Sequence, residues 1–239
     1  MKLSSVSGKN WIIKKYNHQI VSHLKENFNL SEIISRLLSI RNIKIEEVNL
    51  FLNPRVKNLL PNPFILKDME KSVNRTIKAI VSKEKIGIFG DYDVDGASAT
   101  ALIGNYLKQL EQAFEIYIPD RTSEGYGPSV ESFKKLIDKN VKLILTVDCG
   151  TMSFDAINYA NKRKIDVIVL DHHQSKIELP KAHAIINPNQ LGDNSDLNYL
   201  CAAGVSFMTL VSLNSHLRKS KWFIKNDIKE PNLLDFLDI

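Results

Sequence analysis

The sequence has few cysteines and no long hydrophobic run. Its 239 residues include only Cys149 and Cys201, which cannot form a disulfide framework, so we expect a reducing compartment. The chain has no run of about 18 apolar residues, which argues against a membrane-spanning helix. The first residues, MKLSSVSGKN, include a lysine but no apolar region of the kind that a secretion signal needs. These absences predict a cytoplasmic protein with no membrane contact.

Repeats and compositional bias are also absent. No repeat of fixed period occurs, and 10 glycines and 8 prolines are too few for a collagen-like or low-complexity chain. What is present is ordinary globular composition, with 44% hydrophobic and 25% charged residues, enough to bury a core in one or two domains. The 32 basic and 27 acidic residues give a net charge of +5, which permits a polyanionic partner without requiring one.

The first 65 residues differ in character from the rest of the chain. Ser31 is a good N-cap for a helix whose apolar residues recur at helical spacing over 33–38. Residues 60–64, LPNPF, are expected to be an extended connector because each proline disfavours a helical residue before it. We therefore expect a small helical N-terminal segment over 1–65, followed by a main domain over 66–239.

Strands and helices alternate through the main domain. Apolar runs predict strands over 86–89, 114–118, 141–147, 165–170 and 184–186. Helices are expected over 69–81, with Asp68 as its cap, and over 97–110, 130–137 and 154–163. Continuously apolar strands that alternate with helices indicate an α/β fold, a parallel β-sheet flanked by helices on both faces. Because ligands of such sheets bind at the carboxyl ends of the strands, the residues there are the candidates for function.

Three carboxylates follow the first of these strands. Asp91, Asp93 and Asp95 alternate in a segment that we expect to be extended, so their side chains should point to the same side. Their mutual repulsion favours a bound divalent cation over a solvated acidic turn. A calcium-binding EF-hand is excluded because its twelfth position, which needs a glutamate, is Leu102. The segment also lacks the G-x-G-x-x-G pattern of a dinucleotide-binding fold.

Two later strands are followed by polar groups at the same edge of the sheet. Asp148 follows the strand over 141–147, and we expect Cys149 beside it to be a small buried filler. Asp171, His172 and His173 follow the strand over 165–170. Since neighbours in an extended segment point in opposite directions, we expect one histidine to bind metal and the other to face the substrate or to hydrogen-bond nearby. Carboxylates with imidazoles suit Mn²⁺ or Mg²⁺, and their number suggests two ions, which predicts metal-assisted phosphodiester hydrolysis.

The motifs GDYDVDG, VDCG and DHH, in this order and each after a strand, resemble the first three motifs of the DHH phosphoesterase superfamily. The segments LLPNPFILKDM and IPDRTSEGYG, together with the downstream NP and AGVSF segments, are similar to the RecJ family within it. The resemblance covers essentially the whole chain. It implies a single-stranded-DNA-specific 5′→3′ exonuclease of DNA repair and recombination, with two Mn²⁺ or Mg²⁺ ions.

The resemblance also implies roles for individual residues. Asp148 bridges the two ions, Asp91 is a ligand or a nearby carboxylate, and Asp171 orients the histidines. The implied catalytic residues are Asp93, Asp95, Asp148, His172 and His173, of which all but His173 are also metal ligands. His173 contacts the scissile phosphate. Arg121 and Tyr126 bind substrate, because arginine can clamp a phosphate and tyrosine can stack on a base, although a surface turn is the alternative.

Three functions stay open from the sequence. The leading one is a monomeric exonuclease whose partners are single-stranded DNA and a repair helicase or a single-strand-binding protein. The second is a short-oligonucleotide or cyclic-dinucleotide phosphodiesterase of the same superfamily. The third is an inactive metal- or partner-binding remnant. The basic residues around Trp222 (Arg218, Lys219, Lys221, Lys225 and Lys229) either follow a nucleic-acid backbone or form a solvated connection.

The C-terminal end departs from the family pattern. RecJ-type proteins continue into a strand with a fourth metal-ligating aspartate and then into further domains, whereas this sequence ends in the apolar segment PNLLDFLDI. A terminal segment is normally polar and frayed. We therefore expect an incomplete chain that lacks the fourth motif. Such a chain should bind metal more weakly than the full protein and should have low or no exonuclease activity.

Overall fold

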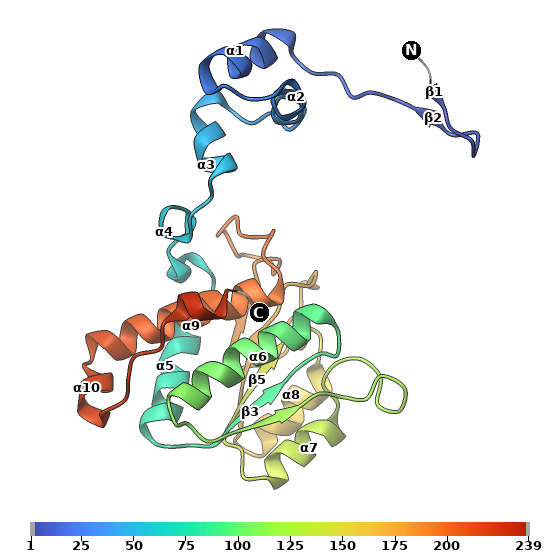
Figure 1. Ribbon diagram of the computed structural model, residues 1–239. Coiled ribbons are helices and arrows are strands. Elements are labelled where there is room, and N and C mark those ends of the chain that lie inside the picture. The colour runs from blue at the N-terminus through green and yellow to red at the C-terminus, as the bar shows by residue number, and fades with distance from the viewer. Residues whose placement is uncertain (1–2, 238–239) are drawn as a thin grey trace. The chain divides into compact units, whose positions relative to one another are not determined.

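The structure is a computed structural model, and it describes residues 3–237. The chain divides into two compact units, Met1–Pro61 and Asn62–Ile239. Each unit is built around its own hydrophobic residues. Figure 1 colours the chain by residue number, with the first unit in blue to cyan. None of the helices in the described part of the chain has both the length and the apolar composition needed to cross a bilayer.

The first unit is mostly helical. Its elements are β1 (Leu3–Ser4), β2 (Asn10–Trp11), α1 (His18–Phe28), α2 (Glu32–Ile40), a 3₁₀ turn (Ile45–Glu47), α3 (Val48–Leu52) and α4 (Val56–Leu59). Ser31 caps α2 as expected, since its hydroxyl accepts a hydrogen bond from the Ile34 amide. Leu24, Leu38 and Val48 form the small core. The antiparallel hairpin of β1 and β2 was not expected, because two-residue strands leave no periodic signal in a sequence.

The second unit is a five-stranded parallel sheet with helices on both faces, which confirms the predicted fold class. Its strands are β3 (Ile86–Phe89), β4 (Phe114–Tyr117), β5 (Leu143–Val147), β6 (Asp166–Leu170) and β7 (Ala184–Ile186), in the order β4-β3-β5-β6-β7. Its helices are α5 (Met69–Val81), α6 (Val94–Gln109), α7 (Val130–Asp138), α8 (Phe154–Lys162), α9 (Ala202–Lys219) and α10 (Trp222–Asn226). Two 3₁₀ turns, Pro63–Ile65 and Leu233–Phe236, complete it.

Side chains alternate between two cores, one on each face of the sheet. Ile86 and Ile88 of β3 pack in the core that includes α5, α6 and α9, and Phe89 packs in the core that includes α7 and α8. The same alternation holds along β5 and β6, so both faces of each strand are buried. Figure 1 shows α5, α6 and α9 on one face and α7 and α8 on the other. Phe236, near the C-terminal end, is buried in the first of these cores.

Local details differ from the expectations at three places. Asp68 precedes α5, but its side chain does not cap the helix; its Oδ2 atom accepts a hydrogen bond from the Ile185 amide, 3.2 Å away. Helix α6 begins at Val94 rather than near Ala97, because Asp93 caps it. The expected extended connector turns into a 3₁₀ helix at Pro63, where Asn62 accepts a hydrogen bond from the Phe64 amide.

Candidate metal centre

The candidate site lies where the strand order of the sheet reverses. Strands β3 and β5 are neighbours, but β3 is followed in the chain by β4 on one side and β5 is followed by β6 on the other side. The connections after β3 and β5 therefore run in opposite directions across the sheet. In open parallel sheets, ligands bind beside the carboxyl ends of strands at such a point. Asp91 and Asp93 follow β3, Asp148 follows β5, and the histidines follow β6. The topology therefore brings the predicted residues to one edge.

The three aspartates of the first motif do not form the extended segment that we expected. Asp93 is the N-cap of α6, and its carboxylate accepts a hydrogen bond from the Gly96 amide at 2.9 Å. Asp95 lies in the first turn of α6 and faces the start of α9, where the amides of Ala202 and Ala203 donate to its two oxygens at 2.7 and 2.8 Å. The expectation of an extended segment was wrong, because the helix begins inside the motif. Asp95 still reaches the site, since its Oδ2 atom lies 3.4 Å from Nε2 of His172.

Asp91 remains with the other acids at the sheet edge. It is buried, and burial raises the pKa of its carboxyl. The hydrogen bond from the Gly96 amide lowers the pKa of Asp93 instead. Oxygens of Asp91, Asp93 and Asp148 all lie within 4.8 Å of one another. This spacing places three carboxylate groups around one small volume.

Asp148 stands at the centre of the site. Its backbone is left-handed, with φ of 62°, and only 1% of its surface is exposed. Burial, with the charges of Asp95 and Asp93, raises the pKa of Asp148 to about 8. Nε2 of His172 lies 3.3 Å from Oδ1 of Asp148, yet this buried oxygen accepts no hydrogen bond from any described residue. A buried carboxylate oxygen that accepts no hydrogen bond is costly, which makes Oδ1 of Asp148 a candidate ligand for a cation.

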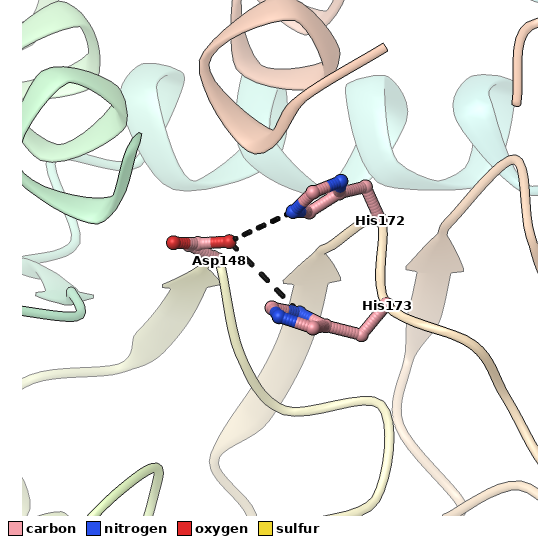
Figure 2. A group of neighbouring side chains, drawn as sticks. All are labelled: Asp148, His172 and His173. Carbon is pink, nitrogen blue, oxygen red and sulfur yellow. Dashed lines mark ion pairs between the residues drawn. The ribbon is translucent and has the colours of Figure 1, made fainter. Parts of the chain in front are cut away.

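Both histidines turn toward Asp148, as Figure 2 shows. His173 Nδ1 lies 3.9 Å from Oδ1 of Asp148, and the two imidazole rings are 4.7 Å apart. The expectation that they point in opposite directions was wrong, because the segment is not extended. The Asp171 Oδ1 atom accepts hydrogen bonds from the amides of His172 and His173, at 2.7 and 3.2 Å, which curls the backbone there.

Asp171 also holds the ring of His173. Its Oδ1 atom lies 2.8 Å from His173 Nδ1, and its Oδ2 atom accepts from the Thr151 amide at 3.1 Å. The hydrogen bond to Asp171 raises the pKa of His173 to about 9 against the opposing effect of burial. Burial raises the pKa of Asp171, but the hydrogen bonds from His173 and Thr151 outweigh it and lower that pKa to about 2. At neutral pH the two groups are thus a charged pair.

Arg121 and Tyr126 lie on the exposed loop between β4 and α7. The Arg121 guanidinium lies 5.4 Å from the centre of the Tyr92 ring. The Tyr126 hydroxyl donates to the Asp148 carbonyl at 3.0 Å, and its ring packs edge-on to His173, 6.1 Å away. A cleft of about 480 Å³ adjoins the site between Tyr126, His173 and the segment 150–156. Tyr126 therefore contacts Asp148 and His173 of the candidate site, whereas Arg121 contacts Tyr92.

Several groups that touch these residues were not predicted from the sequence. The first amides of α9 hold Asp95, and the side chains of Asn187 and Asn189 hold carbonyls of the two histidines. Cys149 is buried, as expected for a filler. The only sequence signal for the missed groups was the presence of the NP and AGVSF segments in the resemblance, which says nothing of what they contact.

The residues present fit a divalent cation of the Mg²⁺ or Mn²⁺ type. Oδ1 of Asp148 and Oδ1 of Asp91 are both buried without a hydrogen-bond partner among the described residues. Carboxylate oxygens with one or two imidazoles are the donors that these ions accept. Two sets of three residues have ligand atoms close enough to hold one ion. One set is Asp91, Asp93 and Asp148, the other is Asp148, His172 and His173, and Asp148 belongs to both.

Comparisons with known proteins identify the family of the chain. The model of the DHH family, N-terminal domain, matches residues 85–237. The chain is 34% identical over 198 residues to the single-stranded-DNA-specific exonuclease RecJ of Bacillus subtilis, covering 82% of this chain and 25% of that protein. It is 34% identical over 211 residues to the Escherichia coli exonuclease of the same name, covering 88% of this chain and 36% of that protein. The chain thus spans about a quarter to a third of the length of these curated relatives.

Two solved structures share the fold. One is an exonuclease RecJ bound to manganese, which matches with a TM-score of 0.59 and 30% identity over 64% of this chain and 38% of that chain. The other is RecJ from Thermus thermophilus in complex with Mn²⁺, which matches with a TM-score of 0.68 over 92% of this chain and 29% of that chain. Its sequence identity is 21%, so this second likeness concerns the fold alone.

Proposed function

The chain belongs to the DHH family and carries a RecJ-like DHH domain, and from that premise we propose that it hydrolyses phosphodiester bonds of single-stranded DNA from the 5′ end. One observation carries the proposal: carboxylates and imidazoles from three strand ends surround Oδ1 of Asp148, which accepts no hydrogen bond from the described residues. The proposed substrate, single-stranded DNA, comes from the names of the relatives. The proposed reaction, metal-assisted hydrolysis, comes from the carboxylate and imidazole groups that could hold metal ions.

We assign the metal ligands to Asp91, Asp93, Asp95, Asp148 and His172. When bound, Mn²⁺ or Mg²⁺ supplies Lewis acidity and lowers the pKa of a coordinated water. Asp148 belongs to both candidate ligand sets, which suits a carboxylate shared by two ions. Asp95 accepts one amide at each oxygen and keeps further lone pairs for a ligand.

The remaining residues bind and orient the substrate. In the metal-free chain the hydrogen bond to Asp171 raises the pKa of His173 to about 9, which favours a positive ring that can contact the scissile phosphate. Asp171 fixes the orientation of that ring through Nδ1. Tyr126 presents an exposed aromatic face to a base, while its hydroxyl is anchored on Asp148. Arg121 adds a cation at the edge of the site.

The test is a nuclease assay of this chain with Mn²⁺ and oligonucleotides labelled at either end. We expect slow release of mononucleotides from the 5′ end of a single strand, no cleavage of a blunt duplex, and no activity with a chelator. Asp148→Asn should abolish cleavage, and Asp138→Asn, an exposed acid at the end of α7, should leave it unchanged. Cleavage of dinucleotides without cleavage of long strands would contradict the proposal and favour a short-oligonucleotide phosphodiesterase.

A further inference from the structure

The turn after β7 packs against the histidine segment. Asn187 is fully buried, and its Oδ1 atom accepts a hydrogen bond from the Asn189 amide at 2.8 Å. The Gln190 amide donates to the Asn187 carbonyl at 3.1 Å. Pro188 lies between the two asparagines and restricts the backbone further. These bonds make the turn rigid by itself, so it can serve as a fixed support.

The amide groups of both asparagines reach the backbone of the histidines. Asn187 Nδ2 donates to the His173 carbonyl at 2.9 Å and to the Thr151 hydroxyl at 3.0 Å. Asn189 Nδ2 donates to the His172 carbonyl. The carbonyls of both histidines are thus held from one side, while the Asp171 carboxylate holds both of their amides.

We propose that Asn187 and Asn189 are positioning residues that set where the two imidazoles lie relative to Asp148. Each ring has only two side-chain torsions, so its place follows closely from its backbone. Groups that support metal ligands in this way matter because a small displacement changes ligand geometry. The expected effect on metal binding rests on the proposed function. The expected effect on the positions of the two imidazole rings is independent of it.

A purely structural role for the turn is the rival explanation, and Gln190 separates the two. Gln190 is buried like Asn187, and its Nε2 atom donates to the Ile185 carbonyl at 2.7 Å. It therefore supports the same turn through a buried amide, and the structure gives it no hydrogen bond to either histidine among the described residues. Loss of its side chain should weaken the turn without releasing the carbonyls of His172 and His173.

The first measurement uses the metal-free chain with ¹⁵N-labelled histidine and records the ring signals by NMR. Asn187→Ala and Asn189→Ala should each shift the signals of His172 and His173, and those of His18, His23 and His216 should stay in place. Gln190→Ala should leave His172 and His173 unshifted. Unmoved ring signals in a folded Asn189→Ala or Asn187→Ala chain, or equal shifts in Gln190→Ala, would overturn the proposal. If Asn187→Ala does not fold, the ring signals of Asn189→Ala decide the question, since Asn189 is only half-buried.

The second measurement titrates Mn²⁺ into the same variants. We expect the two asparagine variants to bind Mn²⁺ about tenfold more weakly and Gln190→Ala to bind it like the unchanged chain. Weakening that simply follows the loss of stability in all three variants would contradict the positioning role. A chain that binds no Mn²⁺ at all would refute the proposed function, whereas the NMR result would still decide the placement of the rings.

Discussion

The Asp171 carboxylate and the imidazole of His173 form an ion pair, with 2.8 Å between Oδ1 and Nδ1. The hydrogen bond raises the pKa of His173 from 6.5 to about 9, and the pair lowers the pKa of Asp171 from 3.8 to about 2. His173 stabilises the fold fully below the unfolded value and loses this effect as the pH rises through 9. Asp171 contributes above its unfolded value and loses its effect as the pH falls through 2. The ion pair therefore stabilises the fold most between the unfolded pKa values, 3.8 for Asp171 and 6.5 for His173.

Asp171→Asn tests this pair. We expect the pKa of His173 to fall back toward 6.5, because the neutral amide no longer favours the protonated ring. A pH titration followed by NMR measures it. The variant should also lose more unfolding free energy at about pH 5.5 than at about pH 9.5, as measured in urea. An equal loss at both values would contradict the charged pair.

Asp148 has the opposite kind of shift, and Asp148→Asn should stabilise the metal-free chain. Its pKa is raised from 3.8 to about 8, so above about pH 4 the folded chain holds a proton that the unfolded chain releases. The Asp148 carboxyl therefore makes the free energy of unfolding fall as the pH rises toward 8. Asparagine removes this penalty, by about 1–3 kcal/mol near pH 8. Urea unfolding with a chelator measures the gain, and added Mn²⁺ should stabilise only the unchanged chain.

Gly96→Ala should damage the site, whereas Gly104→Ala in the same helix should not. A Cβ atom at Gly96 would lie 2.6 Å from Cβ of Asp91 and 2.8 Å from its backbone, so Asp91 must move. We expect a loss of about 1–3 kcal/mol in unfolding free energy and weaker Mn²⁺ binding. At Gly104 the nearest atom lies at 3.5 Å, so alanine should add about 0.5–1 kcal/mol through helix propensity. Equal behaviour of the two variants in a urea melt would contradict this interpretation.

Two arginines that pair with carboxylates should contribute differently to the free energy of unfolding because they differ in burial. Arg75 is only 9% exposed and joins Glu84 and Asp166 at the far edge of the sheet, at 2.7 and 2.5 Å. Arg218 is exposed and pairs with Glu230. Arg75→Met should cost about 2–3 kcal/mol, since it leaves charges without their partner. Arg218→Met should cost less than about 1 kcal/mol. Thermal unfolding in low and high salt measures both.

The strands of the second unit could be predicted because each is an unbroken apolar run. The bounds of β3 and β7 match the expected ranges, and β5 starts at Leu143 rather than Val141. Caps were less predictable. Ser31 caps its helix locally, but Asp68 binds Ile185, which is 117 residues away in sequence. No local pattern can announce a hydrogen-bond partner at that distance.

By itself the sequence determined the α/β class, the order of strands along the chain, and the chemical identity of the acids and histidines at the strand ends. These depend on apolar runs and residue type, which are local. The tertiary structure decided that β3 lies between β4 and β5, that both histidines face Asp148, and that Asp95 meets α9. Strand order, backbone curvature at Asp171 and the docking of α9 arise from contacts between distant segments, and residue spacing along the chain does not encode them.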